Sequence, residues 1–123
     1  PDPLDTAGQW MNGYVFQYNN YGKFSIWKFT DGKAEPLVGW EYSSAIVPYG
    51  WNVLKVVAND GDMEFYINDI LVAAGHDESH TIGRVGVSIW RGSDVKAPFL
   101  LDWVTVSNTA YPDVYTDPIM PVY

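Results

Sequence analysis

The sequence contains no cysteine, so no disulfide holds the chain together and none reports its compartment. It has no apolar run long enough to span a membrane, and no signal peptide at its start. It also lacks a sustained stripe of apolar residues spaced three and four apart, the pattern of an amphipathic helix. These absences exclude a disulfide scaffold and a membrane-spanning helix, and they argue against a helical protein.

Positive charge is scarce. Seven Lys and Arg stand against 15 Asp and Glu, which gives a net charge of −8. Such a surface repels polyanions, so neither nucleic acid nor an anionic membrane is expected as the main partner. The overall charge favours a cation or a neutral ligand.

Aromatic residues are abundant. The 123 residues fit one domain, and they include six Trp and nine Tyr. That is more than a core of this size needs, so some rings should be exposed, and exposed aromatic patches often mark binding sites.

Proline is frequent at both ends, in "PDPLD" and "YPDVYTDPIMPVY", as in linkers. We therefore predict a linker or extension over residues 1–10, a β-domain over 11–108 and a Pro-rich tail over 109–123. The start at Pro1 indicates a processed or excised piece of a longer protein. A native chain beginning there is the alternative.

Strand patterns recur along the chain, and they predict an all-β sandwich or barrel of about eight short strands. In Asp62–Ile67 the alternation sets Met63, Phe65 and Ile67 against Glu64 and Tyr66. The predicted strands are Met11–Tyr18, Lys23–Phe29, Pro36–Trp40, Trp51–Ala58, Asp62–Ile67, Ile70–Ala74, Arg84–Trp90 and Pro98–Ser107.

Turn residues separate these strands. Asp31-Gly32 is a hairpin signal, and Asn59-Asp60-Gly61 and Asn68-Asp69 predict two further tight turns. The segment from Trp51 to Ala74 is therefore predicted to be a three-stranded meander.

The acidic residues suggest a calcium site, with turn formation as the alternative. An EF-hand starting at Asp60 fails, because Phe65 and Leu71 occupy the positions that require Gly and Glu. A site built from sandwich loops stays open. Its candidate ligands are Asp60, Asp62, Asp77, Asp94 and Asp102.

The histidines and the nucleophilic residues give little evidence for a metal site or a catalytic site. His76 and His80 lie four apart, but Asp77 stands where the zinc-protease motif needs Glu, and a surface loop is expected. The sequence has no G-x-S-x-G motif and no P-loop.

A hydrolase would need two carboxylates on one strand face. Asp60, Asp62 and Glu64 have the spacing, but Gly61 puts Asp60 in a turn and leaves Glu64 without its pair. Asp102 is the residue to examine as the second carboxylate.

Exposed aromatic rings point to sugar binding, since flat rings cover the apolar faces of sugars while polar neighbours bind hydroxyls. Tyr14, Tyr42, Tyr49 and Tyr66 could add donors, whereas Trp51 and Trp103 are expected in the core. The candidate ligand contacts are Trp27, Trp40, Glu64, Tyr66, Trp90 and Arg91.

Four groups of residues in the second half of the chain form a recognisable pattern. They are Trp51, Asn52, Leu54, Lys55 and Val56; Phe65, Tyr66, Ile67, Asn68, Leu71 and Val72; Asp77, Gly83, Arg84, Val85 and Gly86; and Asp102, Val104 and Val106. With these residues, most of Gly13–Ser107 resembles a known superfamily, the concanavalin A-like, laminin-G-like jelly rolls. More narrowly, it resembles bacterial domains related to the keto-disaccharide hydrolase family. Upstream, "GYVFQYNNYGKFSIWKFTDGKAEPLVGW" resembles the segment that leads to a Trp in that family.

The resemblance implies a jelly-roll-like sandwich of two antiparallel sheets in a secreted, periplasmic or cell-surface bacterial protein. There are two departures from the family pattern. Asp69 replaces the usual Gly of the Asn-Gly turn, and the chain begins too late to supply the strands that normally precede Tyr14. Those strands would come from a missing segment or a second chain, or the open sheet edge would pair with another copy.

We expect a non-catalytic glycan-binding module rather than an enzyme, with calcium as an open cofactor. A sugar hydrolase and a structural or adhesion domain within a larger assembly are the alternatives, because fold alone does not decide activity.

Overall fold

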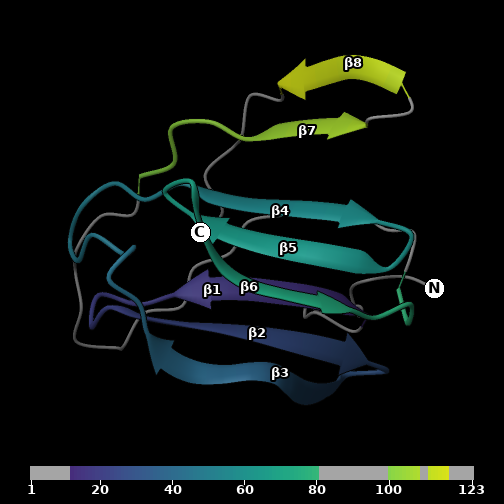
Figure 1. Ribbon diagram of the computed structural model, residues 1–123, viewed down its shortest axis with the longest axis horizontal. Coiled ribbons are helices and arrows are strands. Elements are labelled where there is room, and N and C mark those ends of the chain that lie inside the picture. Colours follow the sequence, from purple (N-terminus) through teal and green to yellow (C-terminus); the bar gives the residue numbers. More distant parts are fainter. Residues whose placement is uncertain (1–11, 81–99, 109–110, 117–123) are drawn as a thin grey trace. The chain divides into compact units, whose positions relative to one another are not determined.

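Residues 12–80, 100–108 and 111–116 are described by the computed structural model (Figure 1). The chain divides into two compact units, residues 1–83 and 84–123. Every regular element in the described ranges is a β-strand, so none of them holds a helix able to cross a membrane. The strands are β1 (Gly13–Tyr18), β2 (Lys23–Thr30), β3 (Lys33–Tyr42), β4 (Leu54–Asn59), β5 (Asp62–Ile67), β6 (Ile70–His76), β7 (Thr105–Asn108) and β8 (Tyr111–Thr116).

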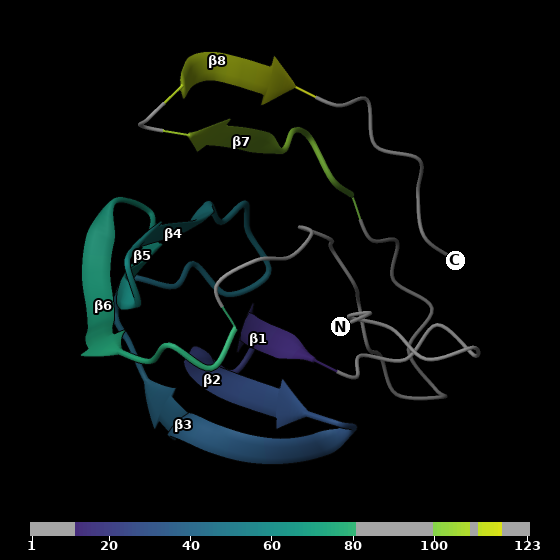
Figure 2. The same cartoon turned by 90° about the vertical axis from the view of Figure 1, so that its right-hand side faces the viewer.

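The first unit consists of two antiparallel three-stranded sheets, with strand orders β1-β2-β3 and β4-β5-β6 (Figure 2). Each sheet is a meander, so strands that are consecutive in sequence are neighbours in space. The predicted all-β class and the predicted meander of β4, β5 and β6 are confirmed.

The strand ends differ from the prediction in places. β3 is longer than expected, and β4 begins at Leu54 rather than Trp51. The prediction is wrong for residues 100–104, which are irregular before β7. β8 pairs with β7 and lies within the segment predicted to be a tail. The predicted strand Arg84–Trp90 lies outside the described residues.

Two-residue turns close three of the hairpins. Both residues of Asp31-Gly32, Asp60-Gly61 and Asn68-Asp69 have positive φ angles, from 49° to 85°. Positive φ at both central positions is the requirement of the type I′ turn, whose twist matches that of the flanking strands. Asp, Asn and Gly tolerate this backbone best, so the predicted turn signals are confirmed for a local steric reason.

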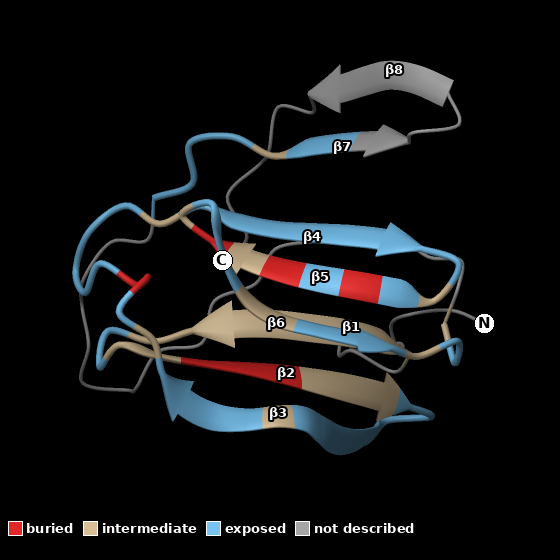
Figure 3. Ribbon diagram, viewed as in Figure 1, coloured by how far each residue is buried: buried red, intermediate tan, exposed pale blue. Residues whose placement is uncertain are grey.

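The inner faces of the two sheets pack against each other. The ring of Phe16 contacts Phe65 of the other sheet edge to face, with 5.2 Å between centroids. Along β5 the predicted alternation is confirmed, because Met63, Phe65 and Ile67 are buried while Glu64 is exposed (Figure 3). The core of the first unit is formed by Phe24, Ile26, Ala45, Ile46, Met63, Phe65 and Ile67.

Two asparagines fix the connection between β3 and β4. Asn68 Nδ2 donates to Ala45 O at 2.8 Å and to Asn52 Oδ1 at 2.9 Å. Asn52 Nδ2 donates in turn to Val47 O at 2.8 Å, and Val53 N donates to Asn68 Oδ1 at 2.9 Å. The connection is therefore held to the β5–β6 turn, which explains why β4 starts only after Val53.

The outer edges of β3 and β4 differ in character. β3 has Pro36, charged residues and two register shifts against β2, all of which discourage the addition of a further strand. β4 is exposed at all six positions and its only charged residue is Lys55 (Figure 3). Leu54 and Val56 pair with the buried residues of β5 yet are themselves 38% and 48% exposed. Among the described residues, β4 pairs with β5 alone.

Substituting Asp69→Gly should stabilise the protein by about 0.5 kcal/mol. Asp69 has φ 65°, where an L side chain is strained, although the gain is offset in part by the greater freedom of Gly in the unfolded chain. The ion pair lost with Lys55, 3.7 Å between Nζ and Oδ1, is exposed and contributes little. Urea denaturation measures the change. Asp69→Ala should destabilise, and a loss of stability in the Gly variant would contradict the steric explanation.

Candidate functional site

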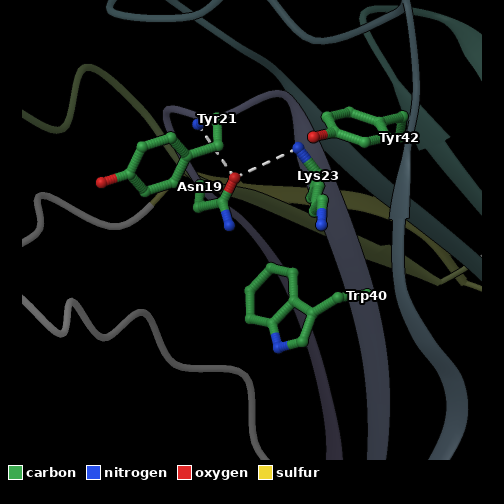
Figure 4. Close-up of a pocket in the computed structure, with 5 residues that line it drawn as sticks. All are labelled: Asn19, Tyr21, Lys23, Trp40 and Tyr42. Carbon is green, nitrogen blue, oxygen red and sulfur yellow. Dashed lines mark hydrogen bonds between the residues drawn. The ribbon is translucent and has the colours of Figure 1, made fainter.

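A groove of about 350 Å³ lies on the outer face of the β1-β2-β3 sheet (Figure 4). Phe24 and Ile26 of β2 face the core, so alternation turns Lys23 to the opposite face. Tyr42 is the cross-strand partner of Lys23 and shares this face. The groove is lined by Asn19, Tyr21, Lys23, Trp40 and Tyr42.

Asn19 shapes one side of the groove. Its Oδ1 accepts hydrogen bonds from the backbone N–H groups of Tyr21 and Lys23, at 3.0 and 3.1 Å. The side-chain oxygen is thus occupied by the β1–β2 turn. The Nδ2 group points away from that turn, toward the side of the groove where Trp40 lies (Figure 4), so it offers a donor to a ligand.

Three aromatic rings border the groove and remain open to solvent. Tyr21 is 79% exposed, Trp40 44% and Tyr42 75%. Lys23 Nζ lies 4.7 Å from the centroid of the Tyr42 ring, a cation–π contact that holds the ammonium beside the groove. Flat exposed rings beside polar donors can stack on the apolar face of a small polar ligand.

Trp27 shares this sheet face but does not line the groove. It is half-buried, and its Nε1 donates to Ser25 Oγ at 2.9 Å. Gln17 Nε2 donates to the same hydroxyl at 3.0 Å. This network occupies the indole N–H of Trp27 and satisfies the buried Ser25, so it supports the sheet beside the groove.

Glu64 and Tyr66 lie on the outer face of the other sheet. The Tyr66 hydroxyl donates to Glu64 Oε2 at 3.0 Å, which raises the pKa of Tyr66. Four of the predicted ligand contacts are therefore divided between the sheets. Trp27 and Trp40 lie on one sheet, and Glu64 and Tyr66 lie on the other. Trp90 and Arg91 lie outside the described residues.

Two tryptophans depart from their expected role. Trp51 and Trp103 were predicted to pack in the core, and this is wrong, since they are 64% and 54% exposed. Trp51 stands in the connection before the open strand β4, and Trp103 stands in the irregular stretch before β7.

Within the first unit, the candidate calcium ligands do not converge. In the described ranges, no group of three His, Asp or Glu side chains is placed to hold a metal ion. Asp60 belongs to a tight turn, and Asp62 Oδ1 lies 2.7 Å from His76 Nδ1, which raises the pKa of His76. Asp94 is outside the described residues, and Asp102 belongs to the second unit.

Asp77 instead ties the segment after β6 to the other sheet. It accepts hydrogen bonds from the Tyr14 hydroxyl at 2.5 Å, Lys28 Nζ at 2.9 Å and Ser79 N at 2.8 Å. Tyr14 and Lys28 are cross-strand partners on β1 and β2. Nearby, His80 Nε2 bonds Phe29 O at 2.7 Å. The structure therefore gives this carboxylate a structural partner set in place of a metal.

These contacts shift the ionisation of all three groups. The hydrogen bonds from Tyr14 and Lys28 hold the pKa of Asp77 well below its usual range. Burial, followed by the bond to Asp77, raises the pKa of Tyr14 to about 12. The bond to Asp77 also raises the pKa of Lys28. The ionised carboxylate is thus the form that the fold requires.

Asn19, Tyr21 and Lys23 were not predicted as site residues. Their only sequence signal is the turn-rich "NNYG" between two strands. The register that brings Lys23 opposite Tyr42 cannot be read from either segment alone.

No family model, curated protein or solved structure matches this chain.

Substituting Asp77→Asn should lower the free energy of unfolding by about 1–3 kcal/mol at pH 7, because the Lys28 ammonium loses its charged acceptor. The pKa of Asp77 is lower in the folded state than in the unfolded state, where it is near 4. The contribution of Asp77 to the stability of the fold is therefore complete above the unfolded pKa and is lost as the pH falls through the folded pKa. The difference between the two proteins should therefore shrink in acid.

Urea unfolding measured from pH 7 to pH 3 tests this. Asp69→Asn is the control, since the Asp69 side chain is 90% exposed. A difference between wild type and Asp77→Asn that is constant with pH would refute the ionic role of Asp77.

Proposed function

We propose that this chain is a non-catalytic carbohydrate-binding module with a concanavalin A-like jelly-roll fold. The observation that carries the proposal is the groove bordered by Tyr21, Trp40 and Tyr42. The two antiparallel sheets packed through Phe16 and Phe65 are compatible with such a sandwich.

The chemistry of the groove suits a sugar. One face of a pyranose ring presents C–H groups that pack well on an indole or phenol ring, and burial of that surface is favourable. The hydroxyls at the rim of the sugar need polar partners. Asn19 Nδ2, Lys23 Nζ and the Tyr42 hydroxyl stand beside the rings to supply them (Figure 4).

The groove supports carbohydrate binding without hydrolysis. The five residues that line it include no Asp or Glu, whereas glycoside hydrolysis uses a pair of carboxylates. Glu64, the carboxylate singled out in the sequence, is bonded to Tyr66 on the other sheet. A module of this kind belongs in a secreted, periplasmic or cell-surface protein, as the family resemblance implies.

Substituting Trp40→Ala should weaken glycan binding by about tenfold or more, because one stacked ring contributes about 1–3 kcal/mol. A glycan array with wild-type protein identifies the ligand, and titration calorimetry measures the loss. Trp51→Ala is the matched control, since Trp51 is exposed but does not line the groove.

Equal affinities for Trp40→Ala and Trp51→Ala would place the site elsewhere. A blank array from demonstrably folded protein would reject carbohydrate binding altogether. The same array run with a chelator tests the calcium expectation.

The edge of β4, which pairs with β5 alone among the described residues, favours a second candidate function, a structural module that joins a larger assembly. We propose that β4 pairs antiparallel with β4 of a second copy. The edge has a single charged residue, Lys55, so it adds little repulsion despite the net charge of −8. In an antiparallel pair of identical strands, the residue at the centre lies opposite its own copy, and core-facing residues lie opposite core-facing residues. Centring on Lys55 would place two lysines opposite each other, so the pairing is centred on Val56 or Val57.

Substituting Val57→Lys should convert such a dimer to a monomer. In either register the new lysine faces a lysine of the second copy, whereas within one chain it faces Glu64 and is tolerated. Sedimentation velocity measures the mass. Leu37→Lys, on the protected edge of β3, should leave the dimer intact. Wild-type protein that stays monomeric at high concentration would end this candidate.

A further inference from the structure

The hydrogen-bonding groups of the groove are unbalanced. Its lining offers donors from Asn19 Nδ2 and Lys23 Nζ, with the phenol hydroxyl of Tyr42 close to the lysine (Figure 4). It contains one cation and no carboxylate. Neutral sugars present many hydroxyl donors, which carboxylates accept well. A lining without carboxylates suits a ligand that is itself rich in acceptors.

The cation in the groove is placed to bind an anion. Among the ion pairs of the described residues, Lys28 and Lys55 have carboxylate partners, and Lys23 has none. Its Nζ is held instead over the face of Tyr42, which leaves ammonium hydrogens available on the side away from the ring. Lys23 and Lys33 are the two lysines that form no ion pair among the described residues, and of these Lys23 lines the groove.

We propose that the groove binds acidic saccharides, namely sugars that bear a carboxylate. The inference rests on the proposed carbohydrate-binding function and specifies its ligand class. The sugar ring stacks on Trp40, and its carboxylate accepts hydrogen bonds from Lys23 Nζ and Asn19 Nδ2. Bonds of this kind to a charged acceptor are about twice as strong as those between neutral groups.

The choice of a carboxylate over a neutral ligand reverses the expectation from overall charge. Net charge acts over the whole surface and is screened within about 10 Å at 0.1 M salt. Selectivity within the groove depends on the groups in direct contact with the ligand. There the lysine is the only charged group, so the local preference is for an anion.

The experiment compares each free acid with its own methyl ester. Oligomers of galacturonate, glucuronate and mannuronate are titrated calorimetrically into the full chain, as free acids and as methyl esters on the same backbone. Wild-type protein should bind at least one acid about tenfold more tightly than its ester. Lys23→Gln should bind both forms with the affinity of the ester, and Trp40→Ala should weaken both.

Lys55→Gln is the matched control. Lys55 Nζ also lies over a tyrosine ring, 4.3 Å from the centroid of Tyr66, but on the other sheet. This variant should keep the full preference for the acid. Unfolding curves establish that each variant is folded.

Each negative result of these titrations leads to a different conclusion. Equal affinity of wild type for acid and ester, or binding only to neutral glycans, would overturn the acidic-saccharide inference and leave the carbohydrate-binding function standing. A preference that survives Lys23→Gln would overturn it as well, because the carboxylate would then lie elsewhere. Absence of binding to any glycan would reject both the inference and the function.

Discussion

Neither three-stranded sheet of the first unit can bury its apolar face without the other. An isolated meander of this size leaves one face of its strands in water, and the hydrophobic cost of that exposure is large compared with the strength of its hydrogen bonds. The contact of Phe16 with Phe65, with Ile26 and Ile67 packed in the same core, buries the centre of these faces. It also sets which side of β2 faces solvent. Once Phe24 and Ile26 face inward, Lys23 must face outward, and the groove takes its position on the far side of the sheet.

Polar contacts then fix how the two meanders meet. Asn52 and Asn68 hold the connection after β3 against the β5–β6 turn, and Asp77 bonds Tyr14 and Lys28 across the sheets. The Asp77 contacts lie among partly buried side chains, where an unpaired charge is costly, so they specify one arrangement of the sheets rather than simply adding stability. In this chain Asn52, Asn68 and Asp77 therefore act as structural ties.

The sequence predicted what short-range rules determine. The alternation of Met63, Phe65 and Ile67 follows from the pleat of a strand, and Asp60-Gly61 follows from the steric demand of a tight turn. The groove depends on the register between two strands, which is a longer-range feature. Two register shifts between β2 and β3 decide which residues of β3 stand beside Lys23, and no local pattern encodes them. Trp40 was identified as a candidate from its residue type and from its place at a predicted strand end beside the polar Glu41. Its neighbours Asn19 and Tyr21 were missed because they act through a turn whose polar residues have an ordinary structural reason to be there.

The groove is also local in the chain, because all its lining residues lie between Asn19 and Tyr42. The hairpins on either side of β2 close short loops, which costs little entropy and happens on the microsecond scale, whereas docking of the two meanders must close the longer connection after β3. We therefore expect the lining to be gathered early in folding and to become rigid only when the second meander docks. A ligand held in the groove would then favour the docked arrangement, because the rings and the buried inner face belong to the same three strands.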